Sequence, residues 1–127
     1  MTLSKTHRSR LDRAIKLAHL SEERQRHGCA IYKGGSLISV GVNVVKNDPY
    51  IIGDCAKNPN HHAETMAIRA AGHADLKGAT IYVARINRHG NPLYSRPCGT
   101  CREAIEQAGI RKIVYTVDNE EEVVYRA

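Results

Sequence analysis

The sequence lacks tryptophan and phenylalanine, and its only large aromatic residues are six tyrosines. Proteins that bind single-stranded nucleic acid along an extended groove usually stack successive bases on aromatic side chains. The shortage of aromatic residues therefore disfavours an extended single-strand platform.

Long apolar runs are also absent. No stretch approaches the roughly 20 apolar residues of a membrane span, and the arginine-rich N-terminal segment carries no apolar core of a secretory signal. The chain has four cysteines, two of them in one short motif, which disfavours a disulfide framework. Thiols persist in reducing compartments, so we expect a cytoplasmic protein without a membrane partner.

The chain of 127 residues is short enough to form a single domain over residues 1–127. Its net charge is +6, and the first 33 residues carry eight basic side chains against three acidic ones. A basic excess favours a phosphate-bearing partner, either a nucleotide or a nucleic acid. A solvated helix face explains the same excess equally well.

Apolar residues at helical spacing predict a first helix over residues 6–26, ended by Gly28. Two strands, 29–33 and 36–42, flank the hairpin signal Gly34-Gly35. The next predicted elements are a loop over 43–61, a helix over 62–71, a strand over 79–86 and a turn over 87–91. A helix over 97–109 follows, with Pro97 in its first turn and Gly109 at its end, and then a strand over 110–116.

This order of elements predicts an α/β fold with a mixed sheet. The C-terminal tail adds a topological constraint. If Glu121 to Tyr125 form a fifth strand, about four residues separate it from the strand that ends near Thr116. A parallel partner needs a crossover of about a dozen residues or more. The tail is therefore predicted to be antiparallel, turning through Asp118-Asn119.

Two short motifs carry the chemistry of the chain. His62 and Glu64 form an H-x-E motif, and Pro97, Cys98 and Cys101 form a P-C-x-x-C motif farther along. One histidine and two cysteines supply three zinc ligands, and catalytic zinc sites keep the fourth position for water. Glu64 is then placed to move the protons of that water. This combination is typical of zinc-dependent nucleobase deaminases.

Other interpretations of these residues remain open. A structural zinc site would need a fourth protein ligand, for which His61, Cys55 and Cys29 are the candidates. Cys29 is expected to be a small buried hydrophobe, and Cys55 a free thiol in the loop. Glu64 taken alone could be an acidic residue that stabilises the start of a helix.

With these motifs, and with the segment from Cys98 to Arg102 reading CGTCR, the chain resembles the cytidine deaminase superfamily. The resemblance implies a three-layer α/β/α sandwich, a sheet of about five strands, zinc as cofactor and a homo-oligomer. In the superfamily that the chain resembles, an antiparallel last strand is typical of the deaminases that act on free nucleosides. In contrast, histidine as the first ligand is typical of deoxycytidylate, tRNA and polynucleotide deaminases, so the chain mixes features of both groups.

The resemblance also suggests residues that contact the substrate. Asn43 ends the second strand and is expected to contact the sugar or base, although asparagine there is often only a turn former. The backbone N–H of Ala63 could face the base, and His61 could stack on it. Three arginines near the motif could meet a 5′-phosphate or serve solubility alone: Arg85, Arg88 and Arg96.

The leading hypothesis is an enzyme that hydrolytically deaminates cytosine in a free nucleoside or nucleotide, of the cytidine, deoxycytidine or dCMP class. The alternative is a deaminase acting on cytosine or adenine in single-stranded DNA or RNA, which the basic N-terminal helix and the long 43–61 loop favour. A third hypothesis is a non-catalytic binding module stabilised by a closed zinc site.

Overall fold

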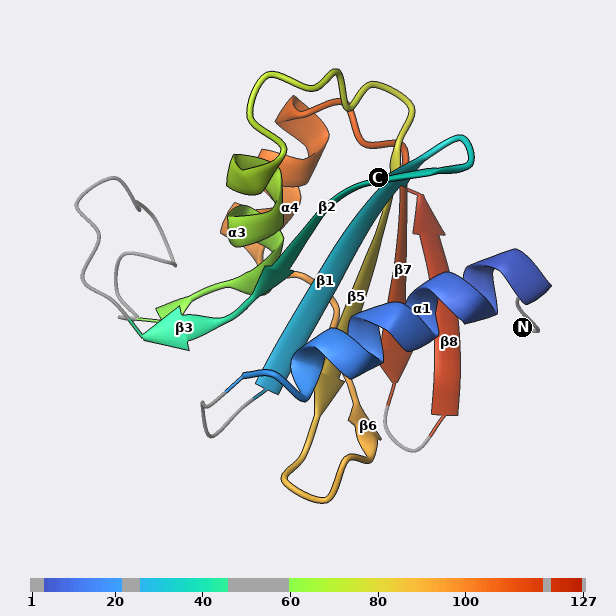
Figure 1. The fold of residues 1–127 in the computed structure, drawn as a ribbon, viewed down its shortest axis with the longest axis vertical. Helices are drawn as coiled ribbons and strands as arrows, with labels where there is room; N and C mark the ends of the chain where they lie inside the picture. Colours follow the sequence, from blue (N-terminus) through green and yellow to red (C-terminus); the bar gives the residue numbers. More distant parts are fainter. Residues whose placement is uncertain (1–3, 22–25, 46–59, 118–119, 127) are drawn as a thin grey trace.

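The computed structural model describes residues 4–21, 26–45, 60–117 and 120–126 (Figure 1). Three helices are described: α1 (Lys5–Ala18), α3 (Ala63–Ala70) and α4 (Gly99–Gln107). The strands of the main sheet are β1 (Arg26–Lys33), β2 (Ser36–Val42), β5 (Thr80–Ile86), β6 (Pro92–Leu93), β7 (Lys112–Val117) and β8 (Glu120–Arg126). Two short strands, β3 (Val44–Val45) and β4 (Asn60–His61), pair with each other.

The main sheet is mixed, as predicted. Its strand order is β2-β1-β5-β7-β8, with β6 attached to β5. β5 and β7 are parallel, and the other pairs are antiparallel. The tail strand β8 runs antiparallel to β7, which confirms the prediction drawn from the length of the connection.

Helices cover both faces of the sheet, so the predicted three-layer sandwich is confirmed. α1 crosses one face, and α3 and α4 lie together on the other (Figure 1). Alternation along β1 divides its residues between two cores. Cys29 and Ile31 belong to the core under α3 and α4, whereas Ala30 and Tyr32 belong to the core under α1.

The first helix ends earlier than predicted, at Ala18 and not at residue 26, and Gly28 lies inside β1. A Cβ at Gly28 would lie 2.2 Å from the carbonyl oxygen of Ala14. Gly28 is therefore required by the close approach of α1 to the sheet, not by the end of a helix. Sequence periodicity does not register such a contact, which explains the error.

Two further expectations need correction. Pro97 precedes the α4 N-cap Cys98, so it is not in the first turn. The 43–61 segment is not entirely loop, because β3 and β4 close its ends. Residues 46–59, which include Cys55, lie outside the described part. Among the described residues, no helix is long and apolar enough to cross a bilayer.

Gly41 sets the distance between β2 and α3, and its replacement is expected to disturb the start of that helix. A Cβ at Gly41 would lie 2.2 Å from the carbonyl oxygen of Ala63 and 2.6 Å from the backbone nitrogen of Ala67. We expect Gly41→Ala to lower the free energy of unfolding by about 1–3 kcal/mol, the usual cost of overpacking. Denaturant titration measures the loss.

Gly35→Ala is the matched control, because no atom lies within 4 Å of a Cβ built there. Equal stability of the two variants would show that the approach of α3 to β2 is not tight in solution.

Candidate active site

The motif residues meet at one edge of the sheet. β1 begins at this edge, while β2 and β5 end there, because Gly28 pairs with Val42 and Arg26 pairs with Ile86. Both helices on the α3 and α4 face begin nearby: His62 is the N-cap of α3, and Cys98 is the N-cap of α4. Two helix N-termini therefore converge on one site.

His62, Cys98 and Cys101 form a compact group of metal-ligand atoms. The Nδ1 atom of His62 lies 3.6 Å from Cys98 Sγ and 3.2 Å from Cys101 Sγ. All three ligand atoms lie within 4.8 Å of one another. Tetrahedral zinc with its usual bond lengths separates such ligands by about 3.3–3.8 Å, so one ion fits between them.

The start of α4 favours the thiolate form of Cys98. The backbone N–H of Cys101 donates a hydrogen bond to Cys98 Sγ at 3.4 Å. Hydrogen bonds with the Cys101 side chain and then with His62 lower the pKa of Cys98 to about 3. Zinc binds cysteine as the thiolate, so this environment prepares Cys98 as a ligand.

Ser95 and Thr116 hold the segment that leads into Cys98. Both are buried, and their hydroxyl groups lie 2.8 Å apart. The hydroxyl of Ser95 also reaches the carbonyl oxygen of Val83 at 3.0 Å, and that of Thr116 donates to the carbonyl oxygen of Leu93 at 2.6 Å. This network fixes the loop before α4 onto β5 and β7. The sequence analysis did not assign a role to either residue.

Glu64 is buried at the metal-ligand group, with only 3% of its surface exposed. Burial raises the pKa of its carboxyl group. Its Oε1 atom has no hydrogen-bond partner within the described structure. A buried carboxylate oxygen without a partner is costly for a residue that only stabilises a helix start. Its position therefore fits a group whose partner arrives with a metal, water or substrate.

The structural-zinc interpretation gains no fourth ligand from the described residues. Cys29 lies in the core and is outside the metal-ligand group, as expected for a small buried hydrophobe. Burial, and then the charge of Glu64, raise the pKa of its thiol well above the usual value. Cys55 and the side chain of His61 lie outside the described part of the chain.

The four candidate substrate-binding residues have different environments. Asn43 is buried at the end of β2, and its Oδ1 accepts a hydrogen bond from the backbone N–H of His27 at 2.8 Å. Ala63 is fully buried in the first turn of α3. The backbone of His61 pairs with Val44 in the β3–β4 ribbon. Arg96 is exposed in the segment before α4.

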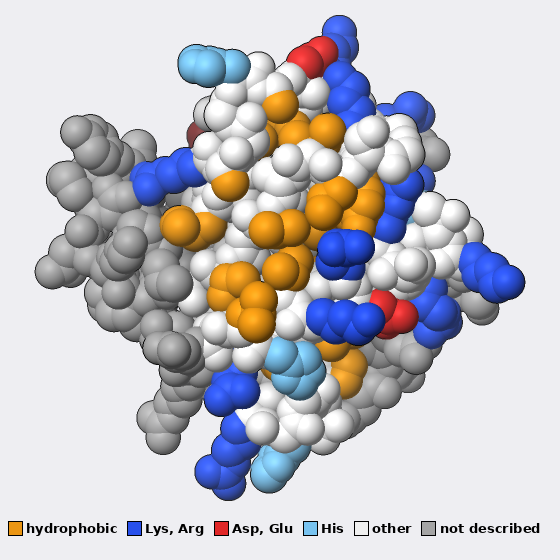
Figure 2. Space-filling view, in the orientation of Figure 1, with side chains coloured by type: hydrophobic (Ala, Val, Ile, Leu, Met, Phe, Trp, Pro, Cys, Tyr) orange, Lys and Arg blue, Asp and Glu red, His pale blue; other side chains and the backbone are white. Residues whose placement is uncertain are grey.

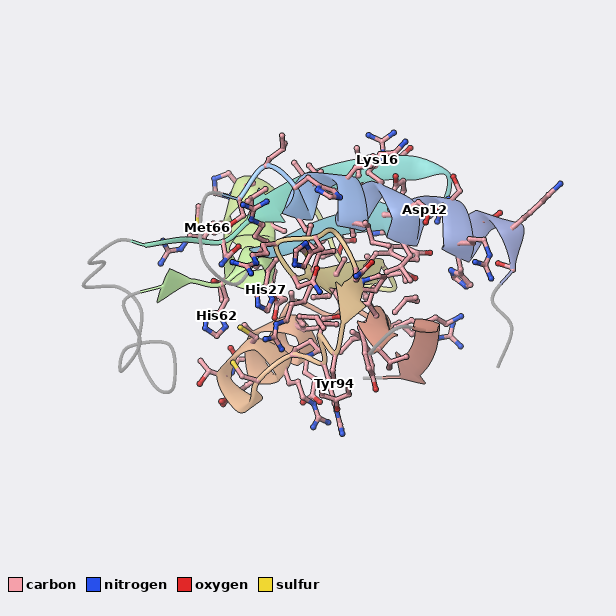
Figure 3. All side chains as sticks on the ribbon, turned by 90° about the horizontal axis from the view of Figure 1, so that it is seen from below. Asp12, Lys16, His27, His62, Met66 and Tyr94 are labelled. Carbon is pink, nitrogen blue, oxygen red and sulfur yellow. The ribbon has the colours of Figure 1, made fainter. Side chains whose placement is uncertain are left out.

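His27 is a site residue that the sequence analysis missed. Figure 3 shows it beside His62, at the start of β1. It shares the alternation of Cys29 and Ile31, so its side chain lies on the α3 and α4 face. That period-two pattern was visible in the sequence, but its meaning depended on knowing that this end of β1 meets α3.

Comparison with known proteins agrees with this geometry. The sequence model described as "Cytidine and deoxycytidylate deaminase zinc-binding region" matches residues 4–117. The matched region contains His62, Cys98 and Cys101, the group that can hold the zinc ion. Deoxycytidylate deaminase of Mus musculus is 37% identical over 57 residues, which make up 45% of this chain and 26% of the mouse protein. The match therefore spans about a quarter of that relative.

Solved structures share the fold. The dCMP deaminase of cyanophage S-TIM5 superposes with a TM-score of 0.67 at 20% identity, covering 90% of this chain and 84% of the phage protein. The cytidine deaminase of Burkholderia pseudomallei superposes with a TM-score of 0.64 at 20% identity, covering 98% and 93% of the two chains. These likenesses establish the three-layer architecture.

Proposed function

Because the chain belongs to the cytidine and deoxycytidylate deaminase family, we propose that it hydrolytically deaminates cytosine in a free nucleoside or nucleotide, giving uracil and ammonia. One observation carries the proposal: the buried carboxylate of Glu64 lies beside a metal-ligand group, with its Oε1 unpartnered among the described residues.

His62, Cys98 and Cys101 would hold the zinc ion. Their separations suit one tetrahedral ion, and two thiolates with one imidazole form a typical zinc ligand set. When bound, zinc supplies a Lewis acid that makes water acidic enough to react near neutral pH.

Glu64 would carry the protons of the reaction. Its carboxylate accepts a proton from the attacking water, whose oxygen forms a bond to C4 of the base. It delivers that proton to the ring nitrogen N3. Glu64 then takes the proton of the hydroxyl group now on C4 and passes it to the amino group. The bond between C4 and that nitrogen breaks, which releases ammonia and leaves the C4 carbonyl of uracil. A raised carboxyl pKa suits this alternation between acid and base.

Two observations support a small substrate. The S-TIM5 enzyme, which shares this fold, has been solved in complex with dCMP and dUMP. The antiparallel tail strand β8 matches the arrangement that the resemblance associates with free-nucleoside deaminases. We propose that this chain likewise acts on a free nucleoside or nucleotide.

The position of the basic helix α1 removes one of the two arguments for a deaminase that acts on single-stranded DNA or RNA. Basic side chains lie beside an exposed apolar area on the face seen in Figure 2, which is the face that carries α1. A groove of about 450 Å³ lies on this face, lined by Ser9, Arg13, Lys16, Leu17, Leu20 and Tyr32. However, α1 and the zinc-ligand group lie on opposite faces of the sheet. These cations therefore do not line a path beside Glu64, and the 43–61 loop is the argument that remains.

Substrate contacts by Asn43, Ala63, His61 and Arg96 remain proposals. Asn43 uses one side-chain oxygen to hold the backbone of His27, so its contact with substrate would add to a structural role. The single domain over residues 1–127, the homo-oligomer and the cytoplasmic location also stay predictions.

A substrate panel tests the proposed function. Zinc-loaded protein is incubated separately with cytidine, deoxycytidine, dCMP, adenosine and a cytosine-containing single-stranded oligonucleotide, and ammonia release is measured. We expect turnover of at least one free cytosine nucleoside or nucleotide and none of adenosine. Turnover confined to the oligonucleotide would establish the polynucleotide alternative, and release from no substrate would contradict deamination.

A further inference from the structure

Two basic side chains face each other across the strands that lead into the site. His27 of β1 pairs directly with Arg85 of β5. Arg85 shares the alternation of Ile81 and Val83, so both side chains project from the α3 and α4 face. Directly opposed residues of an antiparallel pair have Cβ atoms about 5 Å apart, close enough for both to contact one small group.

The charges of both Arg85 and His62 act on the imidazole of His27. Burial first, then the charges of Arg85 and His62, lower the pKa of His27 to about 4. The imidazole is therefore neutral at pH 7, with one N–H donor and one acceptor nitrogen. The backbone of His27 is fixed by Asn43, which accepts from its N–H at 2.8 Å and donates to its carbonyl oxygen at 3.3 Å.

Arg85 has no acidic partner within the described structure. Its Nε atom is buried and unpartnered there, and its Nη1 atom reaches only the carbonyl oxygen of Tyr94, at the long distance of 3.5 Å. The backbone N–H of Arg85 donates to the Thr116 hydroxyl at 3.2 Å, which ties the residue to the network before α4. A half-buried guanidinium in this state retains donors suited to an oxyanion.

Of the three arginines near the zinc motif, Arg85 alone projects from a strand of the main sheet toward this face. Arg88 is exposed in the turn after β5, and Arg96 is exposed before α4. An anion held between Arg85 and His27 would give the guanidinium the charged partner that it lacks within the described structure.

We propose that Arg85 and His27 bind the 5′-phosphate of a free nucleotide, which makes a cytosine nucleoside monophosphate the preferred substrate of the site. The inference rests on the proposed function. Arg85 supplies the charge and the paired N–H donors that suit a phosphate, and His27 donates one hydrogen bond from its imidazole. A terminal phosphate monoester suits this half-buried pair better than a phosphodiester, whose chain must continue past it.

The first test compares nucleotide with nucleoside. Arg85→Gln is expected to lower kcat/KM for dCMP by about 10- to 100-fold, the range for a lost hydrogen bond to a charged group, while leaving kcat/KM for deoxycytidine within about twofold. Arg111→Gln is the matched control, because Arg111 is exposed beside the start of β7, at the opposite end of the sheet. Equal losses for dCMP and deoxycytidine in Arg85→Gln would overturn the proposal, as would a loss confined to the oligonucleotide.

The second test does not depend on turnover. Inorganic phosphate is titrated into the zinc-loaded protein while the ring C–H signals of His27, assigned by comparison with His27→Gln, are followed by NMR. We expect saturable shifts in the parent protein and in Arg111→Gln, and their loss in Arg85→Gln with zinc content unchanged. Unchanged phosphate binding in Arg85→Gln would overturn the phosphate site. If no substrate is deaminated by the parent protein, the proposed function fails, and this titration still decides whether the pair binds an anion.

Discussion

Glu64→Gln is expected to keep the fold and bind zinc normally while losing at least about 100-fold in turnover, the scale of one general acid–base residue. The amide has the same shape as the carboxylate but cannot accept and return a proton. The parent side chain is only 3% exposed, and its Oε1 is unpartnered within the described structure, so the substitution breaks no hydrogen bond at that atom. Steady-state ammonia release and zinc analysis on the same preparation measure both effects.

Glu106→Gln provides the matched control, because Glu106 is an exposed glutamate in the last turn of α4. It should retain full turnover. Near-normal turnover in Glu64→Gln would instead mean that Glu64 acts only as an acidic residue at the start of α3.

Cys98→Ser and Cys101→Ser are expected to lose zinc. A serine hydroxyl stays protonated near neutral pH and replaces a thiolate poorly, whereas the environment of Cys98 lowers its thiol pKa to about 3. Residues that only hydrogen-bond to a metal ligand contribute about 10- to 100-fold to metal affinity. We therefore expect the loss of a ligand itself to lower the zinc affinity by at least about 100-fold. Zinc competition with a chromophoric chelator measures the affinity. The apo variants should also unfold more readily, because bound metal stabilises the native state.

Cys29→Ala is the control for a cysteine outside the ligand group. Cys29 lies in the core beneath α3, so its replacement should reduce stability slightly and leave the zinc content intact. Full zinc retention in both Cys98→Ser and Cys101→Ser would remove His62, Cys98 and Cys101 as the metal site.

The sequence by itself determined the metal-ligand group and the topology of the tail, and it predicted the role of Glu64. The ligands and Glu64 could be predicted because they lie close together in two short motifs, where the types and spacing of residues are sufficient. The antiparallel direction of β8 followed from chain length, since the connection after β7 cannot hold a crossover. The order of helices and strands likewise indicated the mixed sheet.

Only the tertiary structure decided which distant residues share the site. His27 and Arg85 are far apart in the sequence, and their opposition depends on the register of β1 with β5. Gly28 was predicted to end a helix, but the structure shows that glycine is required there by the close approach of α1 to the sheet. The sequence did not indicate which face of the sheet α1 covers. In the structure, α1 and its basic residues lie on the face opposite the zinc-ligand group. Strand register, helix contact and choice of face arise from long-range packing, which local sequence patterns do not encode.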